Sequence, residues 1–386
     1  MSAGPSVDVT RGRYLVRAGD CQACHTAAGG KPFAGGRAVP TPFGTIYSTN
    51  ITPDPDTGIG DWSDADFYRA MHAGIRRDGK HLYPAFPYPW FTKLDVDDVR
   101  AIRAYLATLP PVRQLNRPNA LPWPLSVRSA MAVWNSRYFD AGGYRDDPMR
   151  SAQWNRGAYL VQGLGHCSAC HGDKNFAGAV DKKHPLTGGF AEHVYAPSLG
   201  GGLRDGLGGW SVQDIVDYLG DGRNAKSAAT GPMAEVVADS TQYLTEADRR
   251  AMAVYLKSLP ARQNDSVDAA DADLMKQGHA LYTDNCEGCH LRAGTGEAGA
   301  FPPLQGSAAI QAAEPDSLIA VILHGARAPA TRADASALAM PAFADKLDNA
   351  EVAALISYIR QAWGNRASAV SADKVSDLRK TLRQSP

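Results

Sequence analysis

The sequence has neither a long apolar run nor a surplus of charge of either sign. No stretch of about 18 consecutive apolar residues occurs among its 386 residues, so we expect no membrane-spanning helix. Lysine plus arginine and aspartate plus glutamate both number 40, and this balance argues against a nucleic-acid-binding protein. The length predicts two to four domains, because one hydrophobic core rarely serves more than about 250–300 residues.

Cysteine is scarce, and every cysteine lies in one short motif, Cys-x-x-Cys-His. The three copies are Cys21–Cys24–His25, Cys167–Cys170–His171 and Cys286–Cys289–His290. Two thiols one helical turn apart can bond to the two vinyl groups of one porphyrin, and the adjacent histidine can bind the iron. The motifs therefore predict three covalently bound haems c, with these six cysteines as attachment sites and these three histidines as proximal ligands.

A zinc site or a redox-active cysteine pair would explain the motifs less well. Paired zinc motifs usually lie within about 15–20 residues of each other, whereas these begin at residues 21, 167 and 286. A redox pair has no reason to carry histidine at the next position three times. Haem attachment also requires export, so we expect a periplasmic protein. The first residues, MSAGPSVDV, contain no apolar signal-peptide core, and we expect that a leader has been removed.

Two further features repeat with the motif. A glycine opens an apolar stretch before each copy, with leucine three residues later: Gly12 and Leu15, Gly157 and Leu160, Gly278 and Leu281. After each copy an apolar helical pattern ends in an aligned tyrosine, at Leu94–Tyr105, Leu244–Tyr255 and Leu347–Tyr358. Asp95, Thr245 and Asp348 stand where a helix cap is expected, with an acidic residue three positions later. Two Trp-Ser-x-x-Asp stretches, at Ser63 and Ser211, predict further helix starts.

These repeats predict a mainly α-helical chain of three tandem class I cytochrome c-like domains, each around one haem. We expect domain 1 at residues 1–112, domain 2 at 153–262 and domain 3 at 263–386, the last with a polar C-terminal tail. Residues 113–152 are rich in proline, tryptophan and arginine. We expect this connecting segment to pack on domains 1 and 2.

A low-spin haem usually takes a sixth ligand, and methionine is common in that position. Met233 and Met340 precede the C-terminal helices of domains 2 and 3 in corresponding loops that contain proline or glycine. A core role is the alternative for each methionine, but the position in the repeat favours iron ligation.

Domain 1 departs from this pattern. Its corresponding window, residues 83–87, has Phe86 where a methionine is expected. The remaining candidates are His81, Met71, Met131 of the connecting segment, or no ligand. We rank His81 first; Met71 fits a buried helix face.

The chain resembles the tri-haem cytochrome c subunits of membrane-associated dehydrogenases over nearly its whole length. The resemblance rests on these stretches: Arg11–Val16, Asn50–Asp54, Leu82–Tyr88, Asn155–Val161, Ala196–Leu199, Gly231–Val237, Phe301–Leu304 and Met340–Phe343. It implies that Met233 and Met340 are axial ligands. Phe86 is a departure, because many members have methionine there.

The resemblance implies an electron-transfer subunit without an active site of its own. Its partner would be a catalytic subunit that is a quinoprotein, flavoprotein or molybdenum enzyme, and its acceptor a quinone or an oxidase. The family also implies peripheral association with the outer face of the cytoplasmic membrane. Two alternatives stay open: a peroxidase-like haem enzyme whose first haem is open, and a free periplasmic electron shuttle.

Overall fold

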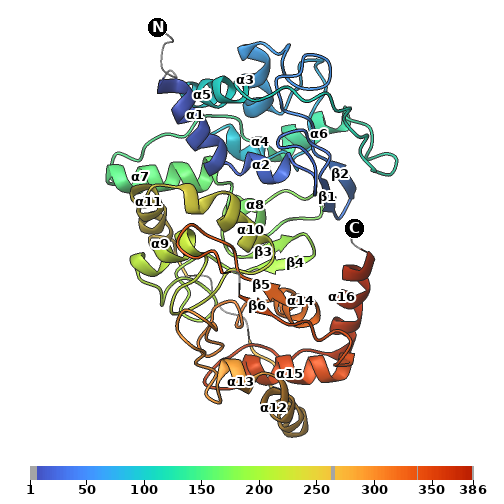
Figure 1. Ribbon diagram of the computed structural model, residues 1–386, viewed down its shortest axis with the longest axis vertical. Coiled ribbons are helices and arrows are strands. Elements are labelled where there is room, and N and C mark those ends of the chain that lie inside the picture. Colours follow the sequence, from blue (N-terminus) through green and yellow to red (C-terminus); the bar gives the residue numbers. More distant parts are fainter. Residues whose placement is uncertain (1–6, 262–265, 337, 385–386) are drawn as a thin grey trace. The chain divides into compact units, whose positions relative to one another are not determined.

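The computed structural model describes residues 7–261, 266–336 and 338–384 (Figure 1). Helices make up 41% of the chain, and strands are few, as the sequence predicts. The chain divides into two compact units. Unit 1 holds the residues up to His166 together with 239–245, and unit 2 holds 167–238 and the residues from Glu246 onward. The division into three domains stays a prediction.

Unit 1 consists of short helices and one antiparallel hairpin. Its elements are α1 (Val7–Ala18), α2 (Cys21–Cys24), β1 (Ala38–Thr41), β2 (Gly44–Tyr47), α3 (Asp64–Ala73), α4 (Tyr88–Phe91), α5 (Val96–Leu106), α6 (Ala130–Tyr138), α7 (Ala152–Tyr159), a π-helical turn (Leu160–Leu164) and a 3-10 turn (Thr241–Tyr243). In the hairpin, Ala38 pairs with Tyr47 and Thr41 with Gly44.

Unit 2 repeats the same kinds of element. They are α8 (Ser168–His171), β3 (Gly189–Ala191), β4 (Val194–Ala196), α9 (Val212–Asp221), α10 (Pro232–Asp239), α11 (Glu246–Lys257), α12 (Ala272–Asn285), α13 (Glu287–His290), α14 (Asp316–His324), β5 (Ala326–Arg327), β6 (Ala339–Met340), α15 (Asn349–Gln361) and α16 (Ala372–Gln384). The pairs β3–β4 and β5–β6 are antiparallel.

The glycines that open the apolar repeats allow two helix pairs to approach closely. Helix α1 packs against α5, and α12 packs against α15 (Figure 1). A Cβ atom at Gly12 would lie 1.9 Å from the carbonyl oxygen of Ala101, and one at Gly278 would lie 2.2 Å from that of Ala354. Glycine therefore serves here to bring two helix backbones together.

The predicted helix starts are largely confirmed. Ser63 and Ser211 each accept a hydrogen bond from the backbone of the third helical residue, an aspartate, whose carboxylate accepts one in return. Asp348 and Glu351 form the same capping box at the start of α15. Asp95 is the cap residue of α5, as predicted, but its side chain makes no capping hydrogen bond, so the capping box expected there is wrong.

Asp98 forms a buried network in place of the predicted capping box. Its carboxylate accepts a hydrogen bond from Arg11 of α1 at 2.5 Å and another from the Tyr159 hydroxyl of α7 at 2.6 Å. The Tyr159 oxygen also accepts a bond from the backbone N–H of Asp95. A buried carboxylate needs such partners, because burying an unpaired charge is costly. Asp98 thus joins three helices of unit 1.

The connecting segment packs on the rest of unit 1 through side-chain to backbone hydrogen bonds. The side-chain oxygens of Asn116 and Asn119 accept from the backbone N–H groups of Asn50 and Tyr47. Toward the end of the segment, the Tyr144 hydroxyl donates to the side chain of Asn155 on α7. These contacts reach both the β1–β2 region and the first helix of predicted domain 2.

The C-terminal tail is more ordered than the sequence suggests. Residues after Trp363 form α16, whose Val375 and Leu378 are buried in the core with α14 and α15. The buried guanidinium of Arg360 donates to the carbonyl oxygens of Ser368, Ile310 and Ala312 at 2.9–3.1 Å. Burial lowers its pKa to about 10, yet the group stays charged at neutral pH. The tail is therefore part of the fold of unit 2.

We predict that Gly278→Ala destabilises the protein. Replacing a mid-helix glycine with alanine ordinarily stabilises by about 1 kcal/mol, but here the methyl group would force α12 and α15 apart. Such overpacking costs about 1–3 kcal/mol, so the melting temperature measured by circular dichroism should fall. Gly209→Ala is the control, because a Cβ atom at Gly209 would have no neighbour within 4 Å. Equal melting temperatures for the two variants would contradict this account.

Candidate functional site

Each Cys-x-x-Cys-His motif forms a single helical turn. The backbone N–H of the histidine donates to the carbonyl of the first cysteine four residues earlier, at 3.0 Å for His25 and 2.9 Å for His171 and His290. Residues four apart lie on the same side of a helix. The first thiol and the imidazole of each motif therefore share one side, as attachment of one porphyrin requires.

Each of the three imidazoles is oriented by a backbone carbonyl. Nδ1 lies 2.6 Å from the oxygen of Thr49 for His25, 2.7 Å from that of Pro197 for His171, and 3.0 Å from that of Pro302 for His290. A carbonyl can only accept, so Nδ1 carries the proton and Nε2 has a lone pair for iron. Burial also lowers the pKa of each ring, which favours the neutral form.

A glycine with positive φ completes each histidine environment. The carbonyls of His25, His171 and His290 accept hydrogen bonds from Gly35, Gly188 and Gly296, whose φ angles are 76°, 97° and 63°. A Cβ atom at Gly35 would lie 2.7 Å from the Thr49 oxygen, and one at Gly296 would lie 2.7 Å from the Pro302 oxygen. In these two repeats only glycine leaves room for the carbonyl that holds the ring.

The first thiol of each motif does not have the lowered pKa of a reactive thiolate. Burial raises the pKa of Cys21 and Cys167 to about 12 and that of Cys286 to about 11, whereas reactive cysteines have a lowered pKa. Among the described residues, no three His, Cys, Asp or Glu side chains converge as a metal cluster would. Two thiols beside one imidazole with a free Nε2 fit a covalently attached haem c.

Met233 and Met340 are both partly buried and pack against apolar residues. Met340 is in β6 and packs against the core of unit 2. Met233 is the second residue of α10 and packs against the cluster Ala229, Ala234 and Val237. The expected loop position is therefore wrong for Met233, which lies in the first turn of a helix. Iron ligation by either methionine stays a prediction.

In residues 83–87 of predicted domain 1, where a methionine ligand would be expected, Phe86 packs edge-on against Phe91, with ring centroids 5.5 Å apart. Met71 is buried in α3, as its helix pattern predicts, and Met131 lies in α6. The half-buried His81 follows a turn and pairs with Ile75 in a short β-bridge. Ligation of the first haem by His81 stays a prediction.

Sequence reasoning missed one residue beside His81. The Tyr88 hydroxyl donates to Oδ1 of Asn135 at 2.5 Å, and Nδ2 of Asn135 lies 3.4 Å from Nδ1 of His81. Burial raises the pKa of Tyr88, so its hydroxyl keeps the proton that it donates. Asn135 comes from α6, more than fifty residues away in sequence, and no local pattern marks it.

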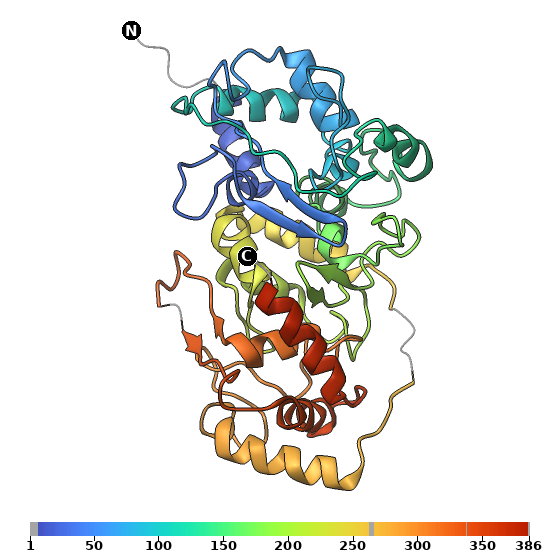
Figure 2. The same cartoon turned by 90° about the vertical axis from the view of Figure 1, so that its right-hand side faces the viewer.

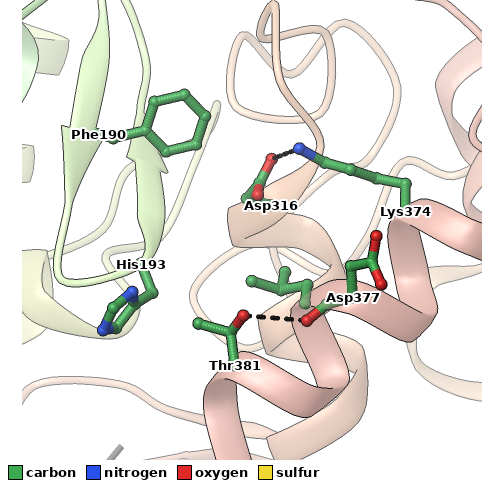
Figure 3. A pocket seen from close by; sticks show the side chains of 7 residues that line it. Phe190, His193, Asp316, Lys374, Asp377 and Thr381 are labelled. Carbon is green, nitrogen blue, oxygen red and sulfur yellow. Dashed lines mark hydrogen bonds and ion pairs between the residues drawn. The ribbon is translucent and has the colours of Figure 1, made fainter. Parts of the chain in front are cut away.

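The other histidines make local contacts. Nδ1 of His184 lies 3.0 Å from Asp181 at the surface, and the ring of His166 lies edge-on to Phe91. His193 borders an open pocket of about 250 Å³ between β3–β4, α14 and α16 (Figure 3). The charged groups of that pocket include the ion pair of Lys374 with Asp316, at 2.9 Å. None of its lining residues belongs to a Cys-x-x-Cys-His motif.

We predict that Gly296→Ala changes one haem. The added methyl would displace the Pro302 carbonyl and weaken its bond to His290. Because that bond makes the histidine a stronger ligand for ferric iron, its loss should raise the midpoint potential of the haem bound at this motif by on the order of tens of millivolts. Gly299→Ala is the matched control, since its φ is also positive but nothing lies within 4 Å. A redox titration in which both variants match the wild type would refute the role of Gly296.

Comparison with known proteins agrees with this geometry. The cytochrome c family model matches residues 9–110 and 275–363. The chain is 41% identical to the cytochrome c subunit of alcohol dehydrogenase (quinone) from Gluconobacter oxydans, over 97% of this chain and 82% of the relative. It is 42% identical to the gluconate 2-dehydrogenase cytochrome c subunit of Pantoea cypripedii, over 96% and 89%.

A third relative, a subunit of the nicotinate dehydrogenase of Pseudomonas putida, is much longer than this chain. It is 43% identical over 93% of this chain, but the match spans only 31% of that protein. The similarity to the two other relatives covers most of both chains. The chain therefore belongs to the cytochrome c family, in the group of cytochrome c subunits of dehydrogenases.

Proposed function

We propose that the chain is a three-haem electron-transfer subunit that relays electrons from a dehydrogenase catalytic subunit to ubiquinone or another terminal acceptor. One observation carries the proposal: three motifs repeat the same arrangement, in which a carbonyl holds Nδ1 and leaves Nε2 for iron. A haem supplies one-electron redox chemistry when bound. The protein's part is to hold, orient and bury it.

The relatives support the kind of partner. Their names identify them as subunits of dehydrogenases for alcohol, gluconate and nicotinate. We propose that this chain likewise serves a separate catalytic subunit, and that it does so in the periplasm, where haem is attached to exported chains. Within the part of the chain that the structure describes, no helix is long and apolar enough to cross a bilayer.

The sixth ligands follow from the position of each side chain in its repeat. We propose the thioether sulfurs of Met233 and Met340 for the second and third haems. Both side chains are partly buried against apolar residues, and a methionine ligand in apolar surroundings favours a higher potential than histidine does. We propose His81 for the first haem.

Ligation by His81 depends on which way the Asn135 amide points. With Oδ1 toward Tyr88, the Nδ2 group donates to Nδ1 of His81 and leaves the ring proton on Nε2. If the amide is turned by half a rotation, oxygen and nitrogen exchange places, and the Tyr88 hydroxyl turns so that its oxygen accepts from Nδ2. Nδ1 of His81 then donates to Oδ1, and Nε2 is free to bind iron.

The orientation with Oδ1 of Asn135 toward Tyr88 favours a second candidate function, that of a peroxidase-like haem enzyme. A His81 with its proton on Nε2 would not ligate iron, and Phe86 cannot. The first haem would then be open to a small molecule such as peroxide, with His81 as an acid–base group. The two functions differ in a property that can be measured, the coordination of the first haem.

We predict that the dithionite-reduced holoprotein does not bind carbon monoxide, because all three irons have a sixth ligand. The measurement is a carbon monoxide titration followed in the visible spectrum and normalised to haem, with the number of haems counted by intact mass. Binding by about one third of the haem would favour the peroxidase-like candidate. A mass corresponding to fewer than three haems would refute the three-haem assignment.

We predict that His81→Ala makes about one third of the haem reactive toward carbon monoxide. Asn135→Asp should leave all haem unreactive, since a carboxylate accepts from both Tyr88 and Nδ1 of His81 and keeps Nε2 free of a proton. It should also lower one midpoint potential, because the ring becomes more basic. Met131→Leu tests the alternative ligand Met131, which lies on α6. If Met131→Leu gives carbon monoxide binding and His81→Ala does not, the ligand is Met131.

A further inference from the structure

Unit 1 contains a long stretch without negative charge. Residues 99–139 include no aspartate or glutamate, although the whole chain has 40 among 386 residues. Six arginines are the only charged residues of this stretch. Three pair with carboxylates elsewhere in unit 1: Arg100 with Asp97, Arg103 with Asp64 and Arg113 with Asp56.

The other three arginines are held by aromatic rings. Arg117, Arg128 and Arg137 lie over the rings of Tyr47, Tyr83 and Tyr138, at 4.0, 4.8 and 5.4 Å from the centroids. Among the described residues, none of the three has a carboxylate at ion-pair distance. A stacked guanidinium keeps N–H groups at its edge for a further acceptor. Each of these three guanidinium groups is therefore held in place by a ring.

The same stretch exposes large apolar side chains. Trp123 is 82% exposed and Val133 72% exposed, and Leu125 and Val127 between them are also exposed. We call these four residues the apolar patch. Successive turns join them, since Val127 N–H donates to Pro124 and Ala130 N–H donates to Val127 just before α6. Tyr83 bonds to Leu125 of the patch and carries Arg128 on its ring, and exposed apolar side chains beside arginine and tyrosine have the composition of a protein-binding hot spot.

The apolar patch lies against the loop of the proposed first-haem ligand. The Tyr83 hydroxyl donates to the Leu125 carbonyl, and Arg128 donates to the His81 carbonyl, both at 2.9 Å. Asn135 of α6 contacts both His81 and Tyr88. Both views place α6 on the side of unit 1 away from α1 (Figures 1 and 2). A protein bound at the patch would approach this loop directly.

We propose that the apolar patch, together with Arg128 and Arg137 beside it, is the docking surface for an acidic face of the dehydrogenase catalytic subunit. The inference rests on the proposed function and makes the first domain the place where electrons enter the chain. Carboxylates of the partner would meet the arginines, and apolar groups would cover Trp123. Electrostatic complementarity of this kind speeds association and fixes the orientation of the partner.

A lipid surface fits the patch less well. A helix that lies on a membrane needs one continuous apolar face. In α6, Ser136 and Arg137 are exposed in the turn that follows the exposed Val133. The patch is also confined to two turns and one short helix. Polar groups are therefore mixed among the apolar ones, as at an interface between proteins.

The test compares two double variants of the full-length holoprotein. Trp123→Ser with Val133→Ser removes the centre of the patch. Phe176→Ser with Leu203→Ser is the control, because these side chains of unit 2 are 90% and 81% exposed. The wild-type chain is affinity-purified from its natural host together with the catalytic subunit that stays bound to it. The probe is this subunit, identified by its ability to reduce the haems of the chain when alcohol, gluconate or nicotinate is added. Each variant is titrated against this purified subunit, and its haem content and midpoint potentials are measured separately.

We expect the patch variant to bind at least about tenfold more weakly, with unchanged potentials, while the control binds like wild type. Added salt should weaken the wild-type complex. Equal affinities for the patch variant and the control would overturn the docking surface and leave the proposed function intact. The docking surface would also be overturned if the patch variant lost the binding of wild type to vesicles containing phosphatidylglycerol but still bound the catalytic subunit like wild type. If the wild-type chain itself accepts no electrons from any bound dehydrogenase, the proposed function fails first.

Discussion

The hydrogen bond from the imidazole Nδ1 to a backbone carbonyl is the interaction on which each candidate haem site depends. The Cys-x-x-Cys-His turn can place the thiols and the ring on one side, but it cannot decide which ring nitrogen carries the proton. The carbonyls of Thr49, Pro197 and Pro302 make that decision. They belong to loops, so the fold beyond the motif must hold each loop within hydrogen-bond distance of the ring.

Two helix pairs fix the helices that lead into the first and third motifs. Close contact of α1 with α5 and of α12 with α15 requires Gly12 and Gly278. These contacts fix the helix that leads into the motif against the helix that ends the repeat. Glycine at each helix crossing lets the two backbones approach, and apolar side chains along the helices fill the space between them.

Many of the helices and the turns of the three motifs could be predicted from the sequence, because they depend on the spacing of nearby residues. The motif turns, the caps at Ser63 and Ser211, and the glycine-led helices all follow from residues within one or two turns of each other. Asp98 could not be predicted, because its partners Arg11 and Tyr159 are distant in the chain. The same is true of Asn135 beside His81. Nor could the order of α16, since its sequence is mostly polar and only Val375 and Leu378 reach the core.

The distance along the chain between each histidine and its carbonyl differs widely, at 24, 26 and 12 residues. In the first two repeats the additional residues include the hairpins β1–β2 and β3–β4, whereas the third repeat has no named strand in that interval. The same hydrogen bond to the ring is therefore made whether or not a hairpin lies between the histidine and its carbonyl. Evolution can thus reshape the surface around one redox centre without altering the metal chemistry inside it.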